Sequence, residues 1–163
     1  MPESQLTGEL SFSVMIRQVI TLKDYLWRIR VYYAVDAYYA GEILSLMEDL
    51  GASGIELRKA ANAMQSGCSN IGLTCSAPER RETVMVIGRA DSPEEFQNTF
   101  DHEKGHLVKH ICLADRVDPF GEEAEYIAGA IGQRMFRVAR RFLCGHCRSE
   151  LPRHIGEAVE DED

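Results

Sequence analysis

The chain has 163 residues, of which 45% are hydrophobic and 27% are charged, and its formal net charge is -8 at pH 7. These are values typical of a globular protein that can bury a core without disulfides. The negative charge argues against a nucleic-acid partner, because such proteins normally carry a basic patch. The sequence contains neither a signal-peptide pattern nor a membrane-length apolar run. We therefore expect a cytoplasmic protein with no membrane partner, with one domain over residues 1–150 and an acidic, disordered tail over 151–163.

The N-terminal third predicts one short strand and two helices. Apolar residues alternate over residues 11–17, which favours a strand. Thr21 begins a segment that can cap a long helix ending near Leu50, because its apolar residues follow helical spacing. These residues are Leu26, Ile29, Tyr33, Ala37, Ala40, Ile43, Leu44 and Met47. Glycines at 51 and 54 end this helix, and a second helix is expected over about 55–66.

The rest of the chain predicts a hairpin followed by two more helices. Strand patterns cover 70–76 and 83–88, and the turn-like residues between them suit an antiparallel pairing. Ser92, Pro93 and Glu95 form a helix start signal, with Ser as the N-cap. A further helix is expected from about Gly121 to Phe142. The elements together predict an α+β fold, with long helices packed on a small antiparallel sheet.

The most informative motif is His102-Glu103-Lys104-Gly105-His106, an HExxH sequence within the first of these two helices. Residues four apart lie on the same face of a helix, so the two imidazoles can bind one zinc ion. Helical projection places Glu103 on the apolar stripe, where a carboxylate is costly unless a partner is present. The alternative is a helix with two surface histidines and a tolerated glutamate, which leaves the buried carboxylate unexplained. We therefore expect Glu103 to act as a general base beside a zinc ion held by His102 and His106.

A catalytic zinc needs a third protein ligand, and acids of the next helix are the candidates. Residues 109 and 112 are Lys and Cys, which excludes the metzincin spacing. His110 is too far along the same helix to share the ion. Glu122 and Glu123 begin the following helix, and the sequence favours neither over the other, while Glu125 fits less well. The alternative role for these acids is a favourable interaction with the helix dipole.

These motifs resemble a known family over roughly residues 70–135. An HExxH helix preceded by a strand and followed by a helix with a glutamate is similar to the smallest gluzincin metallopeptidases. The segments 84–88, 98–103 and 121–129 look like those of zincin-like proteins carried by phages and mobile elements of gut bacteria. The resemblance implies a zincin-like domain, a zinc cofactor and a peptide or protein substrate. It does not locate a second catalytic donor, for which His110 and Tyr126 are candidates.

Two functions follow from this reading. In the first, zinc activates a water and polarises the scissile carbonyl, while Glu103 moves the water's proton to the leaving amine. An extended peptide would then add to a free edge of the hairpin, unless the strand at 11–17 covers that edge. In the second, a phage or mobile element encodes a non-catalytic interaction or regulatory protein with the same fold. The sequence does not set the oligomeric state.

A second metal site is suggested by Cys144 and Cys147, which have the spacing of half a zinc ribbon. No second pair with the usual spacing completes it, and no βαβ unit accompanies it as in redox proteins. Two reduced thiols after a helix end are the simpler interpretation.

Overall fold

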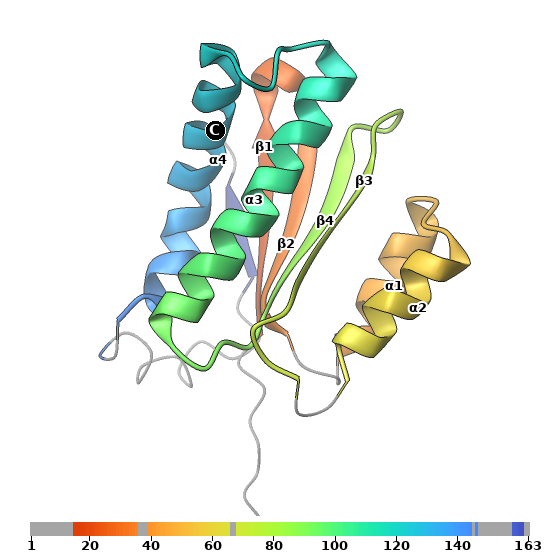
Figure 1. The fold of residues 1–163 in the computed structure, drawn as a ribbon, viewed down its shortest axis with the longest axis vertical. Coiled ribbons are helices and arrows are strands. Elements are labelled where there is room, and N and C mark those ends of the chain that lie inside the picture. The colour runs from red at the N-terminus through yellow and green to blue at the C-terminus, as the bar shows by residue number, and fades with distance from the viewer. Residues whose placement is uncertain (1–14, 36–38, 66–67, 145, 147–157, 162–163) are drawn as a thin grey trace, which may run out of the picture.

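The computed structural model describes residues 15–35, 39–65, 68–144, 146 and 158–161. Its strands form one five-stranded sheet in the order β3-β4-β2-β1-β5, and helices pack on the two faces of that sheet (Figure 1). The strands are β1 (Ile16–Leu22), β2 (Trp27–Val35), β3 (Gly72–Ala77), β4 (Glu82–Gly88) and β5 (Ala158–Asp161). The α-helices are α1 (Ala40–Asp49), α2 (Gly54–Ala63), α3 (Pro93–Asp115) and α4 (Glu122–Ala139), and the 3-10 turns are η1 (Lys23–Tyr25) and η3 (Arg140–Phe142).

The α+β fold class is confirmed, but the sheet is mixed rather than antiparallel throughout. β1 pairs with β2 and β3 pairs with β4 in antiparallel fashion, whereas β2–β4 and β1–β5 are parallel pairs. Parallel neighbours require a crossover that returns the chain to the same end of the sheet. Here α1 and α2 occupy the connection between β2 and the hairpin of β3 and β4. The local patterns predicted the hairpin and had no information about this long-range pairing.

The long helix predicted from Thr21 to about Leu50 is wrong over most of its length. Thr21 belongs to β1, the next residues form η1 and β2, and only α1 at the end is helical. A spacing of four is also a multiple of two, so Ile29 and Tyr33 satisfy a strand as well as a helix. Trp27, Ile29, Val31, Tyr33 and Val35 are all buried at alternate positions, which identifies the strand. Leu26, expected on the buried stripe, is 77% exposed.

The other predicted elements are confirmed to within a few residues. The hairpin of β3 and β4, helix α2 and helices α3 and α4 all lie where the patterns place them. The Ser92 hydroxyl accepts a hydrogen bond from the backbone N–H of Glu95 at 3.2 Å, and Pro93 occupies the first turn of α3. The helix therefore begins at the predicted cap, because Ser satisfies an N–H that has no partner within the helix.

Two predictions at the chain ends have mixed outcomes. The strand expected over 11–17 begins at Ile16 in the structure, and residues 11–14 lie outside the described part. Ala158–Asp161 form β5 beside β1, although we expected disorder across the acidic tail. Residues 151–157 and 162–163 of that tail also lie outside the described part. None of the described helices is long and apolar enough to cross a membrane.

Helices cover the two faces of the sheet and bury two hydrophobic clusters. α3 and α4 pack on one face over Ile29, Val31, Met85 and Ile87, among others. α1 and α2 pack on the opposite face, where the buried residues include Val84 and Val86. The alternation along β4 explains this division, since successive strand residues point to opposite faces. β3, at the end of the sheet, lies between α3 and the α1–α2 pair (Figure 1).

Candidate metal centre

The candidate site is built where β3 passes beneath α3. Gly72, Thr74 and Ser76 alternate along β3 and pair with residues of β4 such as Met85, which faces the α3 side of the sheet. This alternation turns three small residues toward one helix. Small side chains permit close approach, and two of these three carry hydroxyls. β3 therefore faces the HExxH motif with small side chains, two of which are polar.

The two histidines of the motif converge on one point in space. His102 Nε2 and His106 Nε2 are 3.1 Å apart, and the two ring planes are nearly perpendicular. Two nitrogens bound to one tetrahedral zinc at the usual bond length are separated by about 3.3 Å. Both side chains are exposed, and that of His102 is 67% exposed. The 3.1 Å separation is that of a hydrogen bond between the two rings, it is close to the separation of two ligands of one ion, and the pair is open to solvent.

Glu103 is the buried acid of the site. The residue is only 4% exposed, as the apolar stripe predicted. Its Oε2 accepts a hydrogen bond from the Thr74 hydroxyl at 2.7 Å. Its Oε1 lies 4.0 Å from His102 Nε2 and accepts no hydrogen bond from the described residues. A buried carboxylate oxygen without a donor is costly, so this oxygen is set to interact with a group outside the protein.

The position of Glu103 depends on the absence of a side chain at residue 72. A Cβ added to Gly72 would lie 2.7 Å from both Cγ and Oε1 of Glu103, and 2.8 Å from Cγ2 of Thr99. These distances are well below normal van der Waals contact. Gly72 thus lets α3 approach β3 closely enough for Thr74 to reach the carboxylate.

The structure does not bring the predicted third ligands to the histidine pair. Glu122, Glu123 and Glu125 are exposed in the first turn of α4. The hydroxyl of Tyr25 donates a hydrogen bond to Glu123 Oε1 at 3.1 Å, which holds this acid near η1. α4 does lie antiparallel beside α3, as expected, but it packs on the far flank of that helix.

Helical geometry explains the separation between the acids and the histidines. A Cβ added to Gly132 of α4 would lie 3.5 Å from Lys104 Nζ, so Lys104 is on the α4 side of α3. Two residues correspond to about 200° around a helix, so His102 and His106 point nearly opposite to Lys104. No group of three or more His, Cys, Asp or Glu residues that could hold a metal occurs among the described residues. The histidine pair fits two ligands of a zinc ion, and the described residues supply no third protein ligand.

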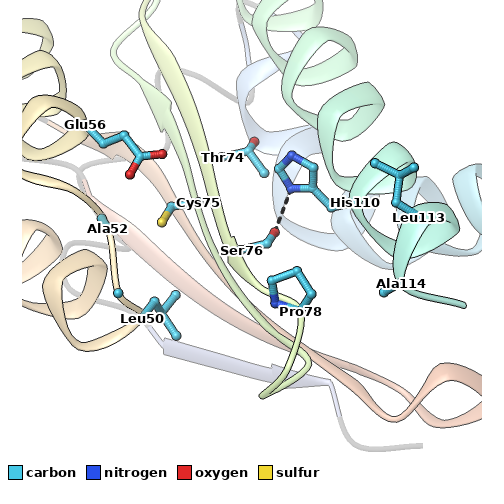
Figure 2. Close-up of a pocket in the computed structure, with 11 residues that line it drawn as sticks. Leu50, Ala52, Glu56, Thr74, Cys75, Ser76, Pro78, His110, Leu113 and Ala114 are labelled. Carbon is cyan, nitrogen blue, oxygen red and sulfur yellow. Dashed lines mark hydrogen bonds between the residues drawn. The ribbon is translucent and has the colours of Figure 1, made fainter.

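His110, one turn further along α3, lies in a pocket beside the pair. Its ring centroid is 6.5 Å from that of His106, and its Nδ1 is 2.8 Å from the Ser76 hydroxyl. The pocket has a volume of about 500 Å³ and is lined by residues of β3 and α3 and by Glu56 of α2 (Figure 2). Burial lowers the pKa of His110, and the neighbouring His106 ring lowers that pKa further. Tyr126, the other candidate donor, is 73% exposed on α4, away from this pocket.

None of the described cysteines forms a metal-binding group with the histidine pair. Cys112 is fully buried on the α4 flank of α3, where burial and then Glu123 raise the pKa of its thiol. Cys144 is exposed, and Cys147 lies outside the described residues. The half-ribbon of Cys144 and Cys147 therefore stays a prediction.

Sequence reasoning missed the contribution of β3. Gly72, Thr74 and Ser76 were predicted only as strand residues, although each contacts a side chain of α3 or limits its approach. The available signal was three small residues at alternate positions in a strand of otherwise apolar character, just before the HExxH helix. Comparison of the chain with protein-family models, with curated proteins and with solved structures found no match.

Proposed function

We propose that this protein is a zincin-like, zinc-dependent peptidase whose site is formed by His102, His106 and Glu103. The observation that carries the proposal is the unsatisfied Oε1 of the buried Glu103, 4.0 Å from the exposed Nε2 of His102. Two converging imidazoles beside a buried carboxylate constitute the ligand and base pattern of metal-dependent hydrolysis. A bound zinc would lower the pKa of its water and polarise the scissile carbonyl.

The protein residues have separate tasks in this proposal. His102 and His106 hold the ion through Nε2, and their spacing requires little rearrangement. Glu103 takes the proton of the attacking water on Oε1 and delivers it to the leaving amine. Thr74 fixes the carboxylate through its hydrogen bond to Oε2, which leaves Oε1 as the reacting oxygen. Glu122 and Glu123 belong to α4, which packs on the side of α3 opposite to the histidines. The proposal therefore does not depend on either acid.

The sheet topology supports a peptide substrate. β3 is an end strand, paired on one side with β4, and no other described strand pairs with its outer edge. β1, which we considered as a possible cover, pairs with β2 and β5 instead. An extended peptide can add to such an edge by main-chain hydrogen bonds. It would then run past Thr74 and Ser76, beside the histidine pair.

The second candidate function is a non-catalytic interaction protein with the same fold, encoded by a phage or mobile element. The lack of a third ligand within the described part of the chain favours it, because a catalytic zinc normally has three protein ligands. The exposed histidine pair favours the enzyme, because both rings are open to solvent and a substrate could reach an ion held between them.

Metal analysis of the purified full chain tests the proposal directly. We expect about one zinc per chain in the native protein, the count of a single site, and almost none in the His102→Ala/His106→Ala double variant. Added zinc should also raise the midpoint of thermal unfolding of the native protein, because an ion bound only to the folded state stabilises it. Lys109→Ala is the matched control, since Lys109 is an exposed neighbour on the same helix.

Three further variants identify the remaining ligand. Glu122→Gln and Glu123→Gln should retain the zinc if the acids of α4 stay where the structure places them. A loss of zinc in either variant would show that α4 rearranges to supply the ligand first predicted. Equal zinc content in the native protein and the double histidine variant would refute the proposed site, and a Cys144→Ser variant would then test the cysteine site.

A further inference from the structure

A chain of hydrogen bonds runs from the core to the pocket beside the histidine pair. Trp27 Nε1 donates to Thr83 Oγ1 at 2.8 Å, and Thr83 Oγ1 lies 2.7 Å from Ser76 Oγ. Ser76 Oγ in turn lies 2.8 Å from His110 Nδ1. Trp27 and Thr83 are fully buried, so these groups have no access to solvent. The four side chains come from β2, β4, β3 and α3.

The direction of this chain follows from the chemistry of its first member. An indole N–H can only donate, so Thr83 Oγ1 accepts from Trp27. The buried Thr83 hydroxyl must place its own proton on an acceptor, and Ser76 Oγ is the one available among the described residues. The Ser76 hydroxyl then has its own proton available for His110 Nδ1, which lies 2.8 Å away. A neutral imidazole that accepts at Nδ1 carries its proton on Nε2, so this direction of hydrogen bonding favours the Nε2–H tautomer of His110.

The Nε2 atom of His110 has no hydrogen-bond partner among the residues that the structure describes. Figure 2 shows Ser76 bonded to one ring nitrogen, while the other lies on the side of the ring nearer to Thr74. No described residue forms a hydrogen bond with that second nitrogen. Burial lowers the pKa of His110 and so favours a neutral ring, which carries one N–H donor. The donor lies beside the outer edge of β3, where an extended chain would pass.

We propose that His110 binds substrate by donating its Nε2–H to a main-chain carbonyl of a peptide lying along the edge of β3. Ser76, Thr83 and Trp27 are positioning residues that hold the ring in this tautomer. The peptide ligand rests on the proposed function, whereas the tautomer rests on the hydrogen-bond network of Ser76 and Thr83. A neutral donor suits a neutral carbonyl, so recognition depends on the main chain of the peptide and not on an acidic side chain.

The tautomer is tested by nitrogen NMR of the imidazole rings in the ¹⁵N-labelled full chain, with His110→Gln used to assign the signals. We expect the Nε2–H tautomer for His110 at neutral pH. In Ser76→Ala the preference should weaken, because Nδ1 loses its donor. An Nδ1–H tautomer in the native protein, or an unchanged tautomer ratio in Ser76→Ala, would overturn the assignment of the positioning residues.

The binding role is tested with a fluorescein-labelled hexapeptide of alternating Thr and Ala, capped at its C-terminus. The full-length Glu103→Gln variant is used so that hydrolysis does not consume the probe. Adding His110→Ala should weaken binding by roughly 2- to 10-fold, the worth of one neutral hydrogen bond. His110→Gln should recover part of this loss, because its amide also donates, and Lys109→Ala should change nothing. Unchanged affinity in His110→Ala, or no binding of the probe, would overturn the proposal.

These outcomes separate the inference from the proposed function. A chain without zinc that still binds the probe through His110 would retain the inference and lose the peptidase. A chain with zinc and hydrolysis but with the opposite His110 tautomer would retain the peptidase and lose the inference.

Discussion

The two flanks of α3 show how one helix serves the core and a site at the same time. On the flank toward α4 and the sheet, Leu107, Ile111 and Cys112 are completely buried. On the flank toward the edge of β3, His102 and His106 are exposed and His110 is half-buried. Glu103 lies where the two flanks meet and is buried like a core residue, yet its partner is a hydroxyl.

The two flanks differ because different elements pack against them. Large side chains bury one flank, and small residues of β3 leave the other open to polar contacts and solvent. The apolar flank is covered by large side chains of α4 and the sheet, which bury residues such as Leu107 and Ile111 completely. The polar flank lies over small residues of an end strand, so its side chains reach both protein hydroxyls and solvent. Changes to the first flank should therefore affect stability, and changes to the second should affect chemistry.

The largest effect is expected at the meeting point of the flanks. Glu103→Gln removes the charge and the basicity of the proposed general base while preserving its shape. We expect peptide hydrolysis to fall by about 10²–10⁴-fold, the usual contribution of a positioned proton-transfer group, with the zinc content unchanged. The measurement is the rate of cleavage of a fluorescent peptide library by the two proteins at equal zinc content. Full activity in the variant would exclude Glu103 from this role.

Substitution of adjacent residues on the two flanks should change the free energy of unfolding by different amounts. Leu107→Ala opens a cavity in the core and should lower the free energy of unfolding by about 2–5 kcal/mol. His106→Ala alters an exposed side chain and should change that free energy by no more than about 0.5 kcal/mol in metal-free protein. Urea unfolding in the presence of a chelator compares them. Comparable losses in both variants would mean that the histidine flank also supports the fold.

A third comparison uses two glycines, one in a crowded position and one in an open position. Gly72→Ala places a Cβ within 2.7 Å of Glu103, so we expect a destabilisation of about 1–3 kcal/mol from overpacking. Gly105→Ala, within the HExxH motif, has no atom within 4 Å of the new Cβ and should stabilise α3 by up to about 1 kcal/mol. Thermal unfolding of both variants measures the difference. A neutral Gly72→Ala would show that α3 does not need its close approach to β3.

The smallest effect concerns the pH dependence of stability. Burial and His106 lower the pKa of His110 below the ordinary value of 6.5, so the unfolded chain binds more protons than the folded chain in this range. The stabilisation is fully present above the unfolded pKa and is lost as the pH falls through the folded pKa. His110→Gln should therefore lose less stability than the native protein on acidification from neutral pH to about pH 5.

Urea unfolding at the two pH values, in chelator, measures this difference. The other titratable groups facing His110 are His106 on the same helix, Cys75 on β3 and Glu56 on α2, and they are present in both proteins. An identical pH dependence in the two proteins would show that His110 is not desolvated.

The spacing of apolar residues predicted an element correctly wherever that spacing fitted only a helix or only a strand. The Ser92 cap, the apolar stripe of α3 and the hairpin strands follow from neighbours in the chain, and the structure confirms them. The helix predicted from Thr21 failed because residues spaced by four satisfy a strand and a helix equally. The alternation from Trp27 to Tyr33 in β2 was the stronger signal, since its β-branched and aromatic residues fit a buried strand.

The sequence by itself determined that His102 and His106 share one face of a helix and that Glu103 lies on its buried stripe, because helical geometry depends only on spacing. Only the tertiary structure decided what surrounds that face. The packing of α4 on the far flank separates Glu122 and Glu123 from the histidines, and the parallel pairing of β2 with β4 leaves β3 at the end of the sheet. The Trp27–Thr83–Ser76–His110 chain joins four elements, so no local pattern contains it. Such contacts arise between residues far apart in the chain, where spacing carries no information.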